Sequence, residues 1–258
     1  MPEPRLLIDE PLYAGAEIPL GEAQARHFGA VLRLETGDVV RPFNSRDGEW
    51  RAHLGAKSKR GVSLIVESLL REARAAPDLD LLFAPVKRHA TDLIVEKATE
   101  LGVRRIRPVV THRTIAETIR IDRLNAIARG AAEQTERFDA PEILDALPLA
   151  KALDGWDVSR PLIYADENGD DAEKAWGGVE GRAPAIGQAL ADWGAATPSR
   201  LALLIGPEGG FTPEERRALR GLTYVIPVSL GPRILRAETA VIAALSVIQS
   251  AWGDWSKA

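Results

Sequence analysis

Two glycine-marked turns near the C-terminal end of the sequence have the residue types of a ligand-binding pocket. The first is GPEGG at 206–210, and the second is SLGPRILRAETA at 229–240. Each follows a short apolar run, 201–205 or 224–228, that predicts a buried strand, and each opens a predicted helix. Glycine has no Cβ, so the backbone of such turns can approach a ligand closely. We therefore predict that the two turns form two walls of one pocket.

The second turn also brings two arginines, Arg233 and Arg236, to this pocket. A guanidinium keeps its charge at all working pH values and offers two parallel donors to an anionic edge. Arg236 is therefore a candidate for stabilising negative charge on a bound substrate. The alternative is that Arg236 forms an ion pair at the start of the last helix, with Glu238 as its partner.

The first turn is a poor phosphate site. Thr212-Pro213-Glu214-Glu215 predicts a helix start in which Thr212 and Glu215 form a capping box and Pro213 takes the first helical position. The acids at 208, 214 and 215 disfavour an anion there, and the turn is neither a Walker loop nor a GxGxxG fingerprint. A ligand without phosphate fits this turn better.

The elements that must position these turns form an alternating pattern. Strands are predicted at 81–84, 106–110 and 161–165, and helices at 89–101 and 120–136. Strand–helix alternation predicts a largely parallel sheet covered by helices, an α/β fold. The acidic, glycine-rich stretch 166–181 reads as a mobile loop.

The first 70 or so residues predict a small β domain, because short apolar runs alternate with turn signals such as Arg46-Asp47-Gly48. Residues 51–60 are basic and predict a protruding hairpin, which is either a solvated hairpin or one that contacts RNA. Residues 75–77 read as a linker. We predict domains at 1–74 and 75–258.

Composition sets outer limits on the function. The chain has 258 residues and a formal charge of −4, but residues 87–137 carry 11 basic against 7 acidic side chains, and 138–200 carry 5 against 12. A phosphate-binding face is therefore compatible with the overall charge. The chain has no cysteine and four histidines, which argues against a metal site. No apolar stretch is long enough for a membrane span and no signal peptide is evident. The absence of cysteine fits the cytoplasmic protein that we expect, and it is also compatible with any other compartment.

The two turns together resemble those of the SPOUT class of S-adenosylmethionine-dependent RNA methyltransferases. More narrowly, they are similar to the family that methylates N3 of a uridine in bacterial 16S ribosomal RNA. The resemblance extends to HFGAVLRL at 27–34, KATELGV at 97–103 and EQTER at 133–137, and it is weakest over 166–190. The family usually has glycine or another small residue before the arginine of the EQTER motif, where this chain has Glu136.

The resemblance implies a PUA-like, RNA-binding β-barrel at 1–74 and a SPOUT methyltransferase domain with a deep trefoil knot at 75–258. It also implies a homodimer, S-adenosyl-L-methionine as cofactor, and 16S ribosomal RNA or the small ribosomal subunit as partner. No metal and no membrane partner are expected.

The resemblance also assigns candidate site residues. Arg236 is the first candidate for catalysis, and Arg137 is the second, with binding of RNA phosphate as its alternative role. The cofactor-binding candidates are Ile205, Gly206, Pro207, Glu208, Gly209, Gly210, Leu230, Gly231, Ile234, Leu235 and Ala240. Ile234 and Leu235 are alternatively plain core residues. The RNA-binding candidates are Arg33, Lys57, Lys59, Arg60, Lys87, Arg88 and Arg233.

Three other functions compete with this hypothesis. The chain could be a non-enzymatic RNA-binding or ribosome-assembly factor that has kept the fold. It could methylate another RNA, such as transfer RNA. A small-molecule enzyme of Rossmann type is the weakest alternative, because its glycine fingerprint is absent from the sequence.

Overall fold

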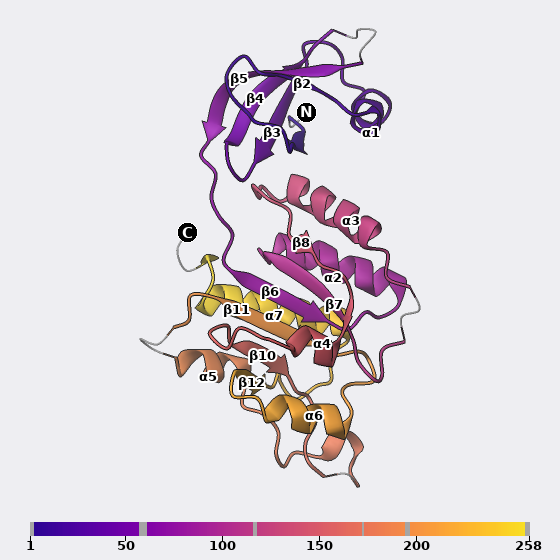
Figure 1. Cartoon of the computed structure of the whole chain (residues 1–258), viewed down its shortest axis with the longest axis vertical. Coiled ribbons are helices and arrows are strands. Elements are labelled where there is room, and N and C mark those ends of the chain that lie inside the picture. The colour runs from indigo at the N-terminus through magenta and orange to yellow at the C-terminus, as the bar shows by residue number, and fades with distance from the viewer. Residues whose placement is uncertain (1–2, 57–60, 116–117, 172, 194–196, 256–258) are drawn as a thin grey trace. The chain divides into compact units, whose positions relative to one another are not determined.

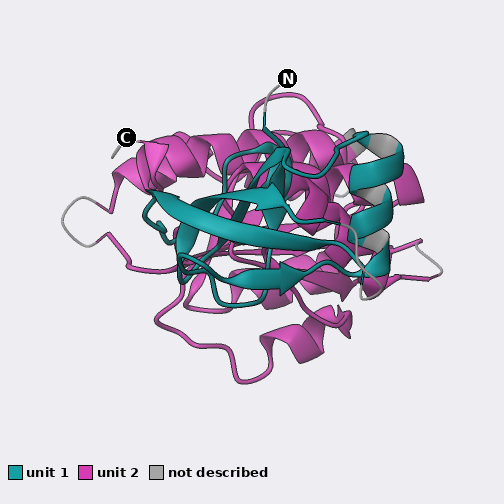
Figure 2. Cartoon of the chain, turned by 90° about the horizontal axis from the view of Figure 1, so that it is seen from above, with its two compact units in different colours: residues 1–75, 132–139 teal, residues 76–131, 140–258 magenta. Residues whose placement is uncertain are grey.

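The computed structural model describes residues 3–56, 61–115, 118–171, 173–193 and 197–255. Its elements are shown in Figure 1. The chain divides into two compact units: unit 1 comprises residues 1–75 and 132–139, and unit 2 comprises residues 76–131 and 140–258 (Figure 2). The predicted domains, 1–74 and 75–258, did not include the return of 132–139 to unit 1.

Unit 1 contains a five-stranded sheet in the order β1-β3-β4-β5-β2. β1 pairs with β3 in parallel, and all other pairs are antiparallel. Apolar side chains of all five strands form one buried core with Phe28 and Leu12. A short α-helix and one π-helical turn follow β2. The bounds are β1 (Arg5–Leu7), β2 (Glu17–Pro19), α1 (Glu22–Arg26), η1 (His27–Val31), β3 (Val39–Asn44), β4 (Gly48–Leu54) and β5 (Ser63–Arg71).

The predicted turn at 46–48 is confirmed as the connection between β3 and β4. Gly48 has a φ of +83°, and a Cβ there would lie 2.2 Å from the backbone oxygen of Arg71. Only glycine fits this position, because both the left-handed backbone and the close approach exclude a side chain.

A buried ion network joins residues 132–139 to this sheet. Glu49, fully buried, accepts from Arg5 at 3.1 Å and from Arg71 Nε at 2.6 Å. Arg5 also donates to the backbone oxygens of Ala132 and Arg137, at 3.0 and 2.7 Å. Burying a carboxylate is costly unless it is paired and hydrogen-bonded, and here three guanidiniums, the third from Arg41, compensate it.

Unit 2 is built on a parallel sheet in the order β12-β10-β11-β6-β7-β8, with β9 also paired to β7. The fully buried runs of β6, β10 and β11 confirm the predicted strands and indicate that helices cover both faces. The strand bounds are β6 (Leu79–Phe83), β7 (Arg105–Val110), β8 (Glu142–Ile143), β9 (Leu147–Pro148), β10 (Leu162–Ala165), β11 (Leu201–Ile205) and β12 (Val225–Val228).

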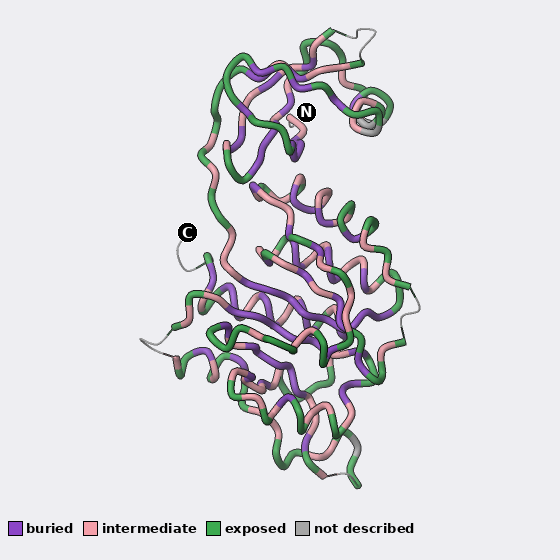
Figure 3. The backbone as a smooth tube through the Cα atoms, viewed as in Figure 1, coloured by how far each residue is buried: buried purple, intermediate pink, exposed green. Residues whose placement is uncertain are grey.

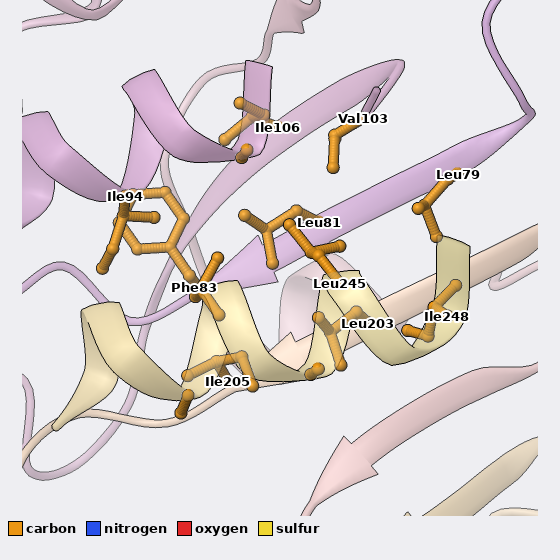
Figure 4. Packing of buried hydrophobic residues seen from close by; sticks show 14 of the residues in the cluster. Leu79, Leu81, Phe83, Ile94, Val103, Ile106, Leu203, Ile205, Leu245 and Ile248 are labelled. Atoms are coloured by element: carbon orange, nitrogen blue, oxygen red, sulfur yellow. The ribbon is translucent and has the colours of Figure 1, made fainter. Parts of the chain in front are cut away.

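Alternation along these strands creates two separate cores. Leu203 and Ile205 pack against α2 and α7 on one face, whereas Leu204 packs with Phe211 and Leu219 of the α6 region on the other. Figure 4 shows the first core between β6, β11 and α7, and Figure 3 shows the continuous burial along the central strands. The helix bounds are α2 (Arg88–Glu100), α3 (Ile121–Gln134), α4 (Leu149–Leu153), η2 (Ala175–Gly177), α5 (Ile186–Ala191), α6 (Pro213–Arg220) and α7 (Ala237–Ala251).

Two helix boundaries show how local chemistry decides an end. The predicted capping box of Thr212 and Glu215 is confirmed, with both reciprocal bonds present. The predicted helix 120–136 ends earlier, at Gln134, because Glu136 has a φ of +63°. A left-handed residue cannot continue a right-handed helix, and this is the position at which the resembling family has glycine or another small residue.

Candidate functional site

A cavity of about 550 Å³, open mouth included, lies where three neighbouring strands of unit 2 end. The carboxyl ends of β10, β11 and β12 meet at one edge of the parallel sheet, which is where open α/β sheets bind their ligands. The lining residues are Ala165, Asp166, Glu167, Trp176, Ile205, Gly206, Pro207, Glu208, Val228, Leu230, Gly231, Arg233, Ile234, Leu235, Ala237 and Ala240.

The two glycine-marked turns form two walls of this cavity, as the sequence predicted. Most of the predicted cofactor-binding residues line it; the exceptions are Gly209 and Gly210, which belong to the first turn but not to the lining. The walls are mainly apolar, with the polar groups of two turns at the edge. A mostly apolar lining with few polar groups is the usual form of a small-molecule site.

Two glycines of the first turn are required by their surroundings. A Cβ on Gly206 would lie 2.5 Å from Cε2 of Phe211, a ring that is buried in the core. Gly210 has a φ of +66°, and a Cβ there would lie 2.6 Å from Oε1 of Glu167. Because Gly206 and Gly210 have no Cβ, the Phe211 ring can pack directly against the backbone of Gly206, and the Glu167 carboxyl can lie against the backbone of Gly210.

Sequence reasoning missed the acidic residues that follow β10, because it read 166–181 as a mobile loop. Asp166 is 1% exposed and accepts from Arg216 Nε and Arg220 Nε, each at 2.8 Å. Glu167 lines the cavity, and burial raises the pKa of its carboxyl above the usual range, with the charge of Asp166 adding to the effect. An acid directly after a buried strand was the only signal for either residue.

Arg236 lies between two cavity-lining residues, Leu235 and Ala237, at the N-cap position of α7. It is exposed and makes no side-chain cap bond. Within the described part of the chain no carboxylate, Glu238 included, forms an ion pair with it. Its neighbour Arg233, predicted to bind RNA, is also exposed and lines the cavity.

Arg137 belongs to unit 1 and has a different environment. Its side chain is 9% exposed, and Nε and NH2 donate to Asp139 Oδ1 at 3.1 and 2.8 Å. Its backbone oxygen accepts from Arg5. A role for Arg137 in catalysis or in RNA binding stays a prediction.

The remaining RNA-binding candidates lie in three places. Arg33 is exposed in unit 1 with a φ of +55°. Lys87 and Arg88 are exposed at the start of α2, where they line a second cavity together with Arg120 and Arg123. The last three candidates, Lys57, Lys59 and Arg60, lie outside the described residues.

Two negative findings apply to the residues that the structure describes. Among them, no group of three or more His, Cys, Asp or Glu side chains is arranged to hold a metal ion. No helix in the same ranges has both the length and the apolar character needed to cross a membrane.

Comparison with known proteins places this architecture in a family. The RNA methyltransferase domain family matches residues 74–249, and the RNA methyltransferase PUA domain family matches residues 20–67. The ribosomal RNA small subunit methyltransferase E of Rickettsia conorii is 30% identical over 95% of this chain and 94% of its own length.

Two solved structures are similar over nearly the whole chain. One is a methyltransferase from Legionella pneumophila in complex with the cofactor SAM, 30% identical with a TM-score of 0.79, covering 98% of this chain and 100% of its own. The other is the ribosomal RNA small subunit methyltransferase E of Neisseria gonorrhoeae bound to S-adenosyl methionine, 26% identical with a TM-score of 0.80, covering 98% and 99%. The chain therefore belongs to the RNA methyltransferase family that includes the ribosomal RNA small subunit methyltransferases E.

Proposed function

We propose that this protein transfers a methyl group from S-adenosyl-L-methionine to N3 of a specific uridine in 16S ribosomal RNA. The observation that carries the proposal is the juxtaposition of the cavity at the ends of β10, β11 and β12 with Arg236, an exposed guanidinium whose neighbours in the chain both line that cavity. The names of the relatives, which are ribosomal RNA small subunit methyltransferases, support the choice of substrate.

The cavity fits the cofactor. Its wall combines apolar side chains with backbone at Gly206 and Gly231, which is the usual composition of a small-molecule site. The two turns would hold the adenine, with main-chain N–H and C=O groups available to its edge and Ile234 and Leu235 available to its face. The absence of a phosphate on this cofactor agrees with the capped, acidic start of α6.

The chemistry needs alignment and charge stabilisation more than a strong base. Bound S-adenosylmethionine supplies a methyl group on a sulfonium, whose sulfur leaves as a neutral sulfide. Loss of the uracil N3 proton leaves negative charge on N3 and the flanking carbonyl oxygens. Arg236 donates to that edge and stabilises the anion, while the two turns fix the direction of approach. The N3 proton goes to water.

Binding of RNA uses cations from more than one segment. Lys87 and Arg88, exposed beside Arg120 on a cavity wall, and Arg233, on the rim of the cofactor cavity, are suited to phosphate contacts. Unit 1, which includes the match to the PUA domain family, supplies further contacts through Arg33 and the basic segment 57–60. A phosphate-binding surface of this kind makes affinity fall steeply with salt.

Three further features of the proposal follow the family resemblance. The protein acts as a homodimer, unit 2 carries a deep trefoil knot, and the protein works in the cytoplasm, where its ribosomal substrate is. Sedimentation equilibrium at several concentrations measures the dimer, and a monomer at all of them would contradict that part.

The experiment that tests the function is methylation of defined substrates followed by mass spectrometry of nucleosides. Purified protein is incubated with S-adenosylmethionine and either free 16S ribosomal RNA or isolated small subunits. We expect a single N3-methyluridine in one of the two substrates. Binding of the donor without methylation at any uridine N3 would contradict the assigned acceptor, and RNA binding with no donor binding would favour an assembly factor.

A further inference from the structure

Glu167 is one of the acidic side chains that line the cofactor cavity. It directly follows β10 after Asp166, lines the cavity, and places Oε1 over the Gly210 backbone, 2.6 Å from where a Cβ would stand. Gly210 therefore keeps open the space that this carboxyl occupies. None of the chemistry described so far uses Glu167.

The backbone that carries Glu167 is held in place from α6. Arg216 and Arg220 pair with Asp166, and Arg216 also donates to the backbone oxygens of Asn168 and Gly169, at 2.8 and 3.0 Å. These bonds fix the residues on both sides of Glu167. A side chain on a backbone held at both flanks loses little further entropy when it binds a ligand.

The charges around Glu167 leave its own charge uncompensated. Asp166 is matched by two arginines, whereas Glu167 forms no ion pair within the described ranges. The cations that act on it are Arg216, already engaged by Asp166, and Arg113, which donates to the backbone oxygen of Gly209 at 2.8 Å. A second acceptor nearby, Asn168 Oδ1, is buried and has no donor among the described residues.

A carboxylate that is partly withdrawn from water and has no counterion is unfavourable, and this loss of hydration raises the pKa of Glu167. A cation that enters the cavity offsets this cost by pairing with the carboxylate. The proposed donor is such a cation: it carries a sulfonium and an α-ammonium group, against one carboxylate.

We propose that Glu167 is the cation-recognition residue of this cavity and binds the positive charge of the methyl donor. The proposal rests on the cavity being the donor site. If Glu167 binds the sulfonium, the cavity should prefer the donor over the product, because methyl transfer turns the sulfonium into a neutral sulfide. Glu167 would then stabilise the bound donor and release the product more readily.

Isothermal titration with three ligands separates the possible sources of positive charge. S-adenosylmethionine carries the sulfonium and the ammonium, S-adenosylhomocysteine carries only the ammonium, and methylthioadenosine carries neither. Each is titrated into the wild-type protein, Glu167→Gln and Glu173→Gln. Glu173 is a matched control, because it is an exposed acid of the same segment and does not line the cavity.

We expect Glu167→Gln to weaken S-adenosylmethionine binding about tenfold, the effect of a hydrogen-bonded charged group, and to leave methylthioadenosine unchanged. A loss confined to S-adenosylmethionine assigns Glu167 to the sulfonium. An equal loss for S-adenosylhomocysteine assigns it to the ammonium. Equal losses for all three ligands, or no loss for any, overturn the proposal, since Glu167 would then contact the shared nucleoside or nothing.

Two further measurements keep the test decisive. Glu167→Asp retains the charge and should recover part of the preference for charged ligands, which a purely structural role would not produce. If Glu167→Gln fails to fold, the wild-type protein must still bind S-adenosylmethionine more weakly at high salt while its methylthioadenosine affinity stays constant. Failure of the wild-type protein to bind S-adenosylmethionine at all would contradict the proposed function itself, not only the role of Glu167.

Discussion

The two candidate catalytic arginines occupy opposite environments. Arg137 in unit 1 is nine-tenths buried, and its guanidinium is paired with Asp139. Arg236 in unit 2 is exposed at the start of α7, and no described acid is paired with it. The same residue type is thus tied to a carboxylate in one unit and left available in the other.

The contrast extends to the surroundings of each residue. The 132–139 segment is connected to its sheet by the buried network of Arg5, Glu49 and Arg71, whereas the walls of the cavity near Arg236 are apolar side chains and backbone. A buried guanidinium with a partner stabilises the fold, and an exposed one beside a cavity can meet a ligand at little cost. We therefore expect the two arginines to affect different measurements.

The largest expected effect is on catalysis by Arg236→Ala. Loss of a donor that stabilises transition-state charge should lower kcat about 10²–10³-fold, with donor affinity and Tm unchanged. Methyl transfer from labelled donor measures kcat, and titration with the donor measures its affinity. Arg217→Ala, which removes an exposed arginine paired with Glu214 on α6, is the control that should keep full activity. Full activity in Arg236→Ala would contradict a catalytic role for Arg236 and, with it, the difference between the two arginines.

Arg137→Ala should act on stability instead. Removing the guanidinium leaves Asp139 without its partner, and we expect the free energy of unfolding to fall by about 1–3 kcal/mol in urea denaturation. Arg137→Ala combined with Asp139→Asn should recover part of that loss. A variant of normal stability whose kcat falls as far as that of Arg236→Ala would instead make Arg137 a catalytic residue.

Gly210→Ala tests the space over the first turn. Alanine at this position must adopt a left-handed backbone, and its Cβ meets Glu167 Oε1. We therefore expect the variant to be destabilised by about 1–2 kcal/mol and to bind the donor more weakly. Gly187→Ala in α5 is the matched control, since a Cβ there meets nothing within 4 Å and should be neutral or slightly stabilising. Equal behaviour of the two variants would show that the turn tolerates a side chain.

The raised pKa of Glu167 predicts a pH dependence of donor binding. The carboxyl attracts a cation only when ionised, so affinity should be complete above its pKa and fall, by up to about tenfold, as the pH drops through it. The raised pKa moves this loss above the ordinary range for glutamate. Asp166, Arg216 and Arg113 act on the carboxyl, and Glu208 and Arg233 share the cavity wall. Donor affinity measured by titration at a series of pH values should show this fall for the wild-type protein and not for Glu167→Gln.

The smallest expected effect is that of Glu136→Gly. Glycine relieves the left-handed conformation at φ +63°, which favours the variant by about 1 kcal/mol, while partly exposed ion pairs with Arg71 and Arg41 are lost. The two changes nearly cancel, so the free energy of unfolding should shift by less than about 1 kcal/mol. A loss several times larger would show that the network around Glu49 depends on Glu136.

The sequence predicted the elements whose signals are local. Continuous apolar runs predicted β6, β10 and β11, because a strand buried on both faces needs apolar side chains at every position. Thr212 and Glu215 predicted the start of α6, because the capping box lies within one turn of helix. The two glycine turns predicted a shared pocket, and β11 and β12, which precede them, end at the same edge of the parallel sheet on either side of β10.

Tertiary structure decided what depends on partners distant in the chain. The acids after β10 are held by Arg216 and Arg220, which lie about 50 residues later in the chain. The sequence near 166–167 therefore did not show that Asp166 forms ion pairs and that Glu167 lines the cavity, and the segment was interpreted as a loop. Arg5 draws 132–139 into unit 1 across more than 120 residues. Residue types and spacing located the walls of the cavity. Whether each charge is paired or free depends on which side chains the fold brings within a few ångströms of it.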